Sequence, residues 1–144
     1  MTNTQKAPVK KALGFYVGII AAVLCAVSAF MYGTKFSSIT YKEKIYDSNI
    51  CLLLGITAGV AIVMLLINKI AAYAPVVLCA GSGIAFLMFI RMMIWPISDT
   101  IYGIEPFQHM NEIYICAALL VLSFLFSEIS LYMKKTKEAK PKAA

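Results

Sequence analysis

Four long apolar stretches, separated by short polar segments, constrain what this chain can fold into. No charged residue falls within 12–34, 48–68 or 70–90, and the fourth stretch, 113–133, contains a single charge, Glu128. Each stretch is close to the ~20 residues that a helix needs to cross a bilayer. Lipid offers no hydrogen-bond partners, so a spanning segment must satisfy its own backbone groups, as a helix does.

We therefore predict an all-α integral membrane protein, a four-helix antiparallel bundle. The expected spans are residues 12–32, 50–68, 73–95 and 112–133. The composition supports this prediction, because 61% of the 144 residues are hydrophobic and only 14% are charged. Soluble domains are nearer half apolar and about a quarter charged, and a chain of this size cannot bury such an excess in its own core.

Basic residues gather on one predicted side of the bilayer. Lysine and arginine beside spans favour the cytoplasmic side, so we predict that both termini are cytoplasmic. Aromatic residues at the span ends, such as Tyr16 and Tyr73 on this side and Tyr32 and Trp95 on the other, suit the two interfaces. The lysines on the predicted cytoplasmic side are Lys6, Lys10, Lys11, Lys69, Lys134, Lys135, Lys137, Lys140 and Lys142.

The two ends of the chain are short and polar. Residues 1–11 form an N-terminal segment, 12–133 form the transmembrane domain, and 134–144 form a basic tail. The tail has too few apolar residues to bury, so we expect it to be disordered and to attract anionic lipid headgroups. Because the basic residues lie only between and beside the apolar stretches, we expect no nucleic-acid partner.

The first apolar stretch also resembles a cleavable signal peptide. Lys10 and Lys11 precede an apolar run, which is followed by small residues at 27–29. The run is longer than a usual signal-peptide core, but the alternative stays open. Cleavage there would leave three spans, with the new N-terminus outside.

Small residues recur at every fourth position in the first two spans. Such stripes let helix backbones approach closely in lipid. They are expected either to pack inside this bundle or, with the first span as the leading candidate, to contact another subunit, and the pattern alone does not decide between the two. The residues concerned are Gly14, Gly18, Ala22 and Ala26 in the first span, and Gly55 and Gly59 in the second.

Two ionisable residues within or beside the spans are the main candidates for a polar site. Glu128 is expected either to pair with Lys69 or Lys11 near the cytoplasmic interface or to hold a proton or cation. In the second case Ser123, Ser127 and Ser130 would help to line a small polar pocket around Glu128.

Arg91 lies near the other end of the third span. Its expected partners are Asp99, Glu105 or Glu112, with Trp95 one turn away for a cation–π contact. The structural interpretation is an ion pair that fixes the second external loop.

Metal and catalytic chemistry have weak support in this sequence. The only histidine, His109, has only spaced acids near it, whereas zinc sites use closely spaced Cys or His. The four cysteines, Cys25, Cys51, Cys79 and Cys116, form no closely spaced pair, although a disulfide between Cys51 and Cys116 is an alternative. We therefore expect that the chain is not an enzyme and that it binds no metal ion and no cofactor.

These observations lead to two functional hypotheses. The first is an accessory, assembly or scaffolding subunit of a larger membrane complex, which would contact other membrane subunits or a second copy of itself. The alternative is a small oligomeric transporter or channel for an ion or small molecule, with Glu128 in the pathway. The small size and the predominance of lysine over arginine favour a bacterial cytoplasmic membrane.

Overall fold

The computed structural model describes residues 10–137, and nearly all of this part of the chain is helical. The prediction of an all-α chain with four long apolar helices is confirmed, and each helix is long and apolar enough to cross a membrane. The four helices are α1 (Leu13–Lys35), α2 (Ser48–Leu66), α3 (Ala74–Ile101) and α4 (Met110–Tyr132). The short elements are β1 (Lys10–Lys11), the 3-10 helix η1 (Phe36–Ser38) and β2 (Thr136–Lys137).

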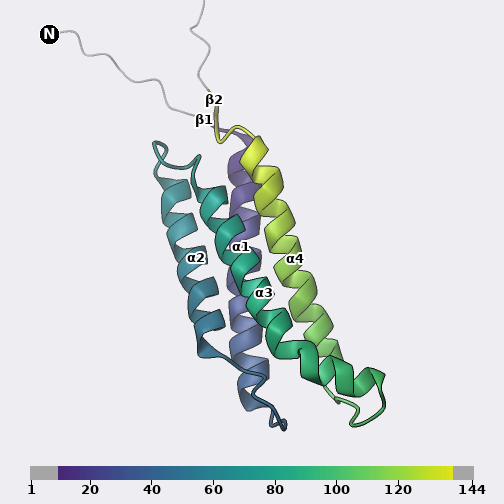
Figure 1. Cartoon of the computed structure of the whole chain (residues 1–144). Coiled ribbons are helices and arrows are strands. Elements are labelled where there is room, and N and C mark those ends of the chain that lie inside the picture. Colours follow the sequence, from purple (N-terminus) through teal and green to yellow (C-terminus); the bar gives the residue numbers. More distant parts are fainter. Residues whose placement is uncertain (1–9, 138–144) are drawn as a thin grey trace, which may run out of the picture.

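The helices form a bundle in which each packs against its two neighbours (Figure 1). α1 contacts α2 and α4, and α3 contacts the same two helices from the other side. At one end, called here the terminal end, β1, β2 and the α2–α3 link (67–73) lie together (Figure 1). The opposite end, called here the loop end, carries the first loop (39–47) and the second loop (102–109).

The core changes character along the bundle. Near the middle of α1 the buried residues are small, including Ala21, Ala22 and Cys25, so the helix backbones pack closely there. At the loop end the core is aromatic: the ring of Tyr32 lies 5.3 Å from that of Phe36 and 5.9 Å from that of Phe89. The wider, aromatic end supports the two loops.

The end of the third helix differs from the prediction. The third span was expected to be 73–95, but α3 continues to Ile101 with Pro96 inside it. Proline in a helix interior removes one hydrogen bond and clashes with the preceding turn, which can kink a helix without ending it. In Figure 1 the last turns of α3 bend away from the rest of the helix. The second loop is therefore shorter than expected.

The start of the tail also differs from the prediction. Residues 134–144 were expected to be disordered, but Thr136–Lys137 pairs with Lys10–Lys11 as a short antiparallel ladder. The backbone N–H of Ala12 also donates to the carbonyl oxygen of Lys135 at 2.9 Å. Backbone pairing, which needs no apolar side chains, provides the order here. The rest of the predicted tail, and residues 1–9, lie outside the described residues.

Candidate functional site

Two side-chain interactions at the loop end of the bundle join the first loop to the end of α3 and to the second loop. Tyr41 Oη donates a hydrogen bond to Asp99 Oδ2 at 2.5 Å, and Lys42 Nζ lies 2.5 Å from Glu105 Oε2. The bond to Asp99 favours the protonated phenol and raises the pKa of Tyr41 to about 12. The Glu105 carboxylate likewise raises the pKa of Lys42. The first contact holds the first loop against the bent end of α3, and the second holds it against the second loop.

Tyr32 fixes the returning half of the first loop from inside the bundle. Its hydroxyl donates to the carbonyl oxygen of Ile45 at 3.3 Å and accepts from the backbone N–H of Asp47 at 2.9 Å. Tyr32 is fully buried, so these two bonds set the path of the loop just before α2. Asp47 then caps α2, because its carboxylate accepts from the backbone N–H of Asn49 at 3.0 Å.

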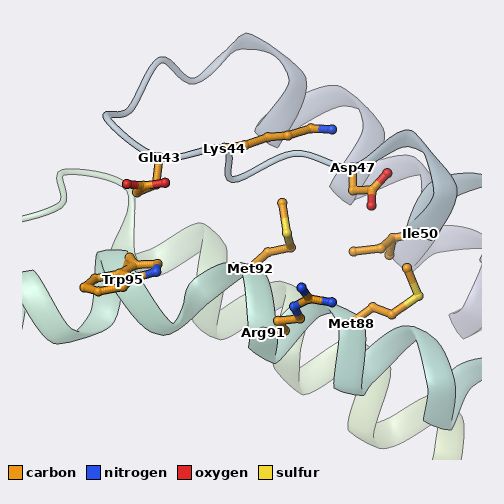
Figure 2. A pocket seen from close by; sticks show the side chains of 8 residues that line it. All are labelled: Glu43, Lys44, Asp47, Ile50, Met88, Arg91, Met92 and Trp95. Carbon is orange, nitrogen blue, oxygen red and sulfur yellow. The ribbon is translucent and has the colours of Figure 1, made fainter.

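A cavity of about 340 Å³ lies between the first loop and α3 (Figure 2). The loop contributes Glu43, Lys44 and Asp47, and one face of α3 contributes the rest of the polar and aromatic lining. The α3 residues follow the three- and four-residue spacing that places side chains on one helix face. The full lining is Glu43, Lys44, Asp47, Ile50, Met88, Arg91, Met92 and Trp95.

The charges that surround this cavity are not neutralised by one another. Within 10–137, no ion pair joins Arg91 or Lys44 to Glu43 or Asp47. In Figure 2 the guanidinium of Arg91 and the carboxylate of Asp47 both face the cavity, and Glu43 lies on the side of Trp95. The site thus presents two cations, two carboxylates and an indole ring to one small volume.

The expected partners of Arg91 are engaged elsewhere. Asp99 accepts from Tyr41, Glu105 pairs with Lys42, and Glu112 Oε1 lies 3.4 Å from His109 Nδ1. The predicted ion pair that would fix the second loop is thus wrong for Arg91 and is replaced by these contacts. Tertiary folding brings Arg91 to the first loop instead. Sequence reasoning missed the cavity residues of that loop, although the dense charges at 42–47 were a usable signal.

Glu128 has a different environment from the one predicted. Its carboxylate accepts a hydrogen bond from Cys79 Sγ at 3.4 Å, and among the described residues it forms no ion pair with Lys69 or Lys11. Lys11 Nζ instead lies 3.7 Å from the centre of the Phe15 ring and donates to the carbonyl oxygen of Leu65. The predicted ion pair of Glu128 is therefore wrong, and this carboxylate faces α3.

The three serines of α4 face α1 rather than Glu128. Ser130 Oγ donates to the carbonyl oxygen of Gly14 at 2.9 Å, and Ser123 Oγ donates to that of Ala21 at 3.1 Å. Ser127 Oγ bonds within α4, to the carbonyl oxygen of Ser123. All three are fully buried. Ser123 and Ser130 thus join α4 to α1, Ser127 bonds within α4, and none of the three donates a hydrogen bond to Glu128.

The small-residue stripe of the first span is used only in part. A Cβ on Gly14 would lie 2.6 Å from the carbonyl oxygen of Lys134, and a Cβ on Gly18 would lie 3.1 Å from Ser130 Oγ. Ala22 is also fully buried, but Ala26 is exposed. A four-residue step rotates about 40° further round a helix than a full turn, so the stripe drifts out of the interface before Ala26.

Gly55 and Gly59 of α2 lie on the outside of the bundle. A Cβ built on either glycine would meet no atom within 4 Å. The exposed residues around them include Leu52, Ile56 and Val63. This face, called here the glycine face of α2, is therefore not used for packing among residues 10–137.

At the terminal end a buried lysine bonds to backbone carbonyls at the end of α4. Lys135 Nζ donates to the carbonyl oxygens of Ser130 and Met133, the latter at 2.7 Å. These carbonyls belong to the last turn of α4, which has no later helical N–H groups to bond. Burial lowers the pKa of Lys135, because it disfavours the charged amine.

Cysteines and acids form no metal or disulfide site in the part of the chain described. All four thiols are free, including Cys51 and Cys116. No group of three or more His, Cys, Asp or Glu side chains among residues 10–137 is arranged to hold a metal ion. His109 Nδ1 lies 3.4 Å from Glu112 Oε1, and its ring centre lies 5.8 Å from that of Phe107.

No protein-family model, no curated protein and no solved structure matches this chain.

Proposed function

We propose that the four helices cross a bacterial cytoplasmic membrane as an antiparallel bundle, with both ends of the chain on the cytoplasmic side. The outward-facing side chains of all four helices support this placement, since they are large and apolar: Phe30 is 71% exposed and Leu87 is 68% exposed. The terminal end, with its lysines, would face the cytoplasm. The loop end would then lie at the outer surface.

We propose further that the chain is an accessory, assembly or scaffolding subunit of a membrane complex. The observation that carries this proposal is the open space at Gly55 and Gly59. Glycine costs a helix about 1 kcal/mol relative to alanine, and nothing inside this bundle requires it at either position. A small-x-x-x-small face lets a second helix approach closely in lipid. A partner helix would therefore pack against the glycine face of α2, which no helix of this chain covers among the described residues.

The satisfied interior of the bundle supports the same proposal. Among the described residues, every buried side-chain nitrogen or oxygen has a hydrogen-bond partner. Polar groups that bind a moving ion or solute must exchange partners with it. The buried serines are instead engaged with helix carbonyls, which suits a structural subunit.

Leucine substitutions on the glycine face test the proposal. Gly55→Leu and Gly59→Leu should abolish stoichiometric association with a membrane partner in mild detergent, while the helix content of the chain stays unchanged. The matched control is Ala80→Leu, which also adds an apolar side chain to an exposed helix position, and it should leave the association intact. Mass measurement of the cross-linked complex separates a different protein from a second copy of this chain.

Two results would overturn the subunit proposal. One is a wild-type chain that remains a monomer in mild detergent and in native membranes. The other is a complex that survives both leucine substitutions unchanged.

The alternative function, an oligomeric transporter or channel, has one favourable observation. Glu128 and Cys79 are only half-buried, so the carboxylate is accessible between α3 and α4. In that case Glu128→Gln should abolish solute or ion flux into vesicles while Ser127→Ala, which keeps the carboxylate, preserves it. Flux that is unaffected by Glu128→Gln would remove this carboxylate from the mechanism.

A further inference from the structure

We propose that the cavity between the first loop and α3 binds the headgroup of a zwitterionic phospholipid of the ethanolamine type. This inference rests on the membrane placement proposed above, because it puts the cavity at the outer headgroup level. It does not depend on the glycine face of α2, which lies on another helix.

The position of Arg91 along α3 places its cation near the lipid phosphates. Arg91 comes 17 residues after Ala74 (91 − 74), the first residue of α3, which corresponds to about 26 Å of rise at ~1.5 Å per residue. The hydrocarbon core is about 30 Å thick. A long side chain just inside that boundary extends its charge to the interface.

The chemistry of the cation side of the cavity suits a phosphodiester. Arg91 has no carboxylate partner within the described chain, since its expected partners bind other residues. A guanidinium binds phosphate oxygens through two parallel hydrogen bonds, and Lys44 of the same lining supplies a second cation.

The chemistry of the opposite side suits an ammonium group. Glu43 lies on the side of the cavity that Trp95 lines (Figure 2), and a cation between them would meet both a carboxylate and an indole face. Asp47, which caps α2, lines the cavity near Arg91 and Lys44, so that side keeps one net positive charge (two cations less one carboxylate). A ligand with only negative charge would approach Arg91 and Lys44 but be repelled by Glu43.

The size of the cavity fits this ligand. Its volume is about 340 Å³, which is equivalent to roughly ten water molecules at ~30 Å³ each. A phosphoethanolamine group has a similar number of non-hydrogen atoms. The apolar part of the lining, Met88, Met92 and Ile50, would contact the glycerol and the first carbons of the acyl chains.

The single tryptophan of the chain is a built-in probe of this site. Trp95 lines the cavity, and no other tryptophan contributes to the emission. The full-length protein in a neutral detergent would be titrated with dihexanoyl phosphatidylethanolamine and, separately, with dihexanoyl phosphatidylglycerol. A third titration with glycerophosphoethanolamine, which has no acyl chains, separates a lipid ligand from a soluble one.

The expected result is a saturable change in Trp95 emission with the ethanolamine lipid, at about tenfold lower concentration than with the glycerol lipid. The soluble headgroup should bind more weakly than the lipid. Saturation by the soluble headgroup at equal or lower concentration would instead assign the site to a free metabolite and overturn the lipid proposal. Equal response to both lipids would also overturn it.

Charge variants locate the effect within the cavity. Glu43→Gln should remove the preference for ethanolamine over glycerol lipid, and Arg91→Gln should weaken both by about tenfold. Lys35→Gln is the matched control, because Lys35 is an exposed cation at the end of α1 that forms no ion pair among the described residues and does not line the cavity. A preference retained in Glu43→Gln contradicts the proposal even if Arg91→Gln fails to fold.

Failure of this proposal can be separated from failure of the proposed function. Gly55→Leu should leave the Trp95 titration unchanged, whatever it does to partner association. If the chain is not retained in membranes after alkaline extraction, the membrane placement fails and this site fails with it. If it is retained but shows no lipid preference, only the headgroup site is wrong.

Discussion

The hydroxyl of Tyr41 lies 2.5 Å from Oδ2 of Asp99, and this hydrogen bond joins residues 58 positions apart in the sequence. Asp99 lies in α3 beyond Pro96, in the part of the helix that was expected to be a loop. The bond therefore exists only because the helix continues through the proline. It holds the first loop close to the wall of the cavity.

This bond predicts a late tyrosine titration. Asp99 favours the protonated phenol and raises the pKa of Tyr41 from 10.0 to about 12. A raised pKa means that the stabilising contribution is complete below pH 10 and is lost as the pH rises toward 12. The tyrosinate absorbance removed by Tyr41→Phe should accordingly rise near pH 12.

Asp99→Asn is the matched variant for this titration. It should move the Tyr41 component back toward pH 10, because the amide oxygen is a weaker, uncharged acceptor. A Tyr41 component that already titrates near pH 10 in the wild-type protein would show that the bond is not formed in solution.

Gly81 is expected to be difficult to replace, because the side chain of Thr57 on α2 lies directly against it. A Cβ at this position would collide with Oγ1, Cγ2 and Cβ of Thr57 on α2, and Thr57 is almost fully buried. Gly81→Ala should lower the free energy of unfolding by about 1–3 kcal/mol through overpacking, measured by denaturant unfolding in micelles. Gly55→Ala, with open space around it, is the control and should not destabilise.

A second substitution checks the cause of that loss. Thr57→Ala removes Oγ1 and Cγ2, two of the three atoms that the methyl group introduced by Gly81→Ala would meet. The double variant should therefore recover part of the stability. If Gly81→Ala alone proves neutral, α2 and α3 do not cross as closely as described.

Ser130 is expected to stabilise the α1–α4 interface. Its hydroxyl donates to the carbonyl oxygen of Gly14 across the interface, and interhelical hydrogen bonds in lipid contribute about 0.5–1 kcal/mol. Ser130→Ala should cost about that much in unfolding measurements. Ser127→Ala is the control, because the hydroxyl of Ser127 bonds only within α4; a larger loss there would contradict the assignment.

Lys135 is expected to hold the terminal end together. Removing its amine leaves the carbonyls of Ser130 and Met133 without that donor. Lys135→Ala should speed amide hydrogen exchange at 133–137 by roughly fivefold, the equivalent of about 1 kcal/mol. The neighbouring Lys134 is exposed, so Lys134→Ala should leave the exchange unchanged, and equal effects of both variants would rule out a specific role for Lys135.

The helices were predictable because their signal is local. The length and polarity of an apolar run can be read from consecutive residues, whatever packs beside it. All four apolar runs form helices. The ends were less predictable. The third span was expected to end at 95, yet α3 continues for five residues past Pro96 (101 − 96) and only bends there, because proline can kink a helix without ending it.

The interfaces show the limit of sequence periodicity. In α1, Gly14, Gly18 and Ala22 lie in the interior but Ala26 does not, because the four-residue stripe rotates out of the contact. Gly55 and Gly59 have the same spacing and face outward. The same four-residue spacing thus occurs on a buried face of α1 and on an exposed face of α2. Only the positions of the neighbouring helices determine which of the two faces is buried.

The sequence by itself determined how many apolar helices the chain has and where each one lies, because these properties depend on consecutive residues. Only the tertiary structure decided the partner of each polar group. Arg91 lines a cavity together with Glu43 and Lys44 but pairs with neither, while Asp99, closer in sequence, accepts a hydrogen bond from Tyr41. Pairing of charges depends on distance in space, and that distance is set by the packing of α3 against the first loop.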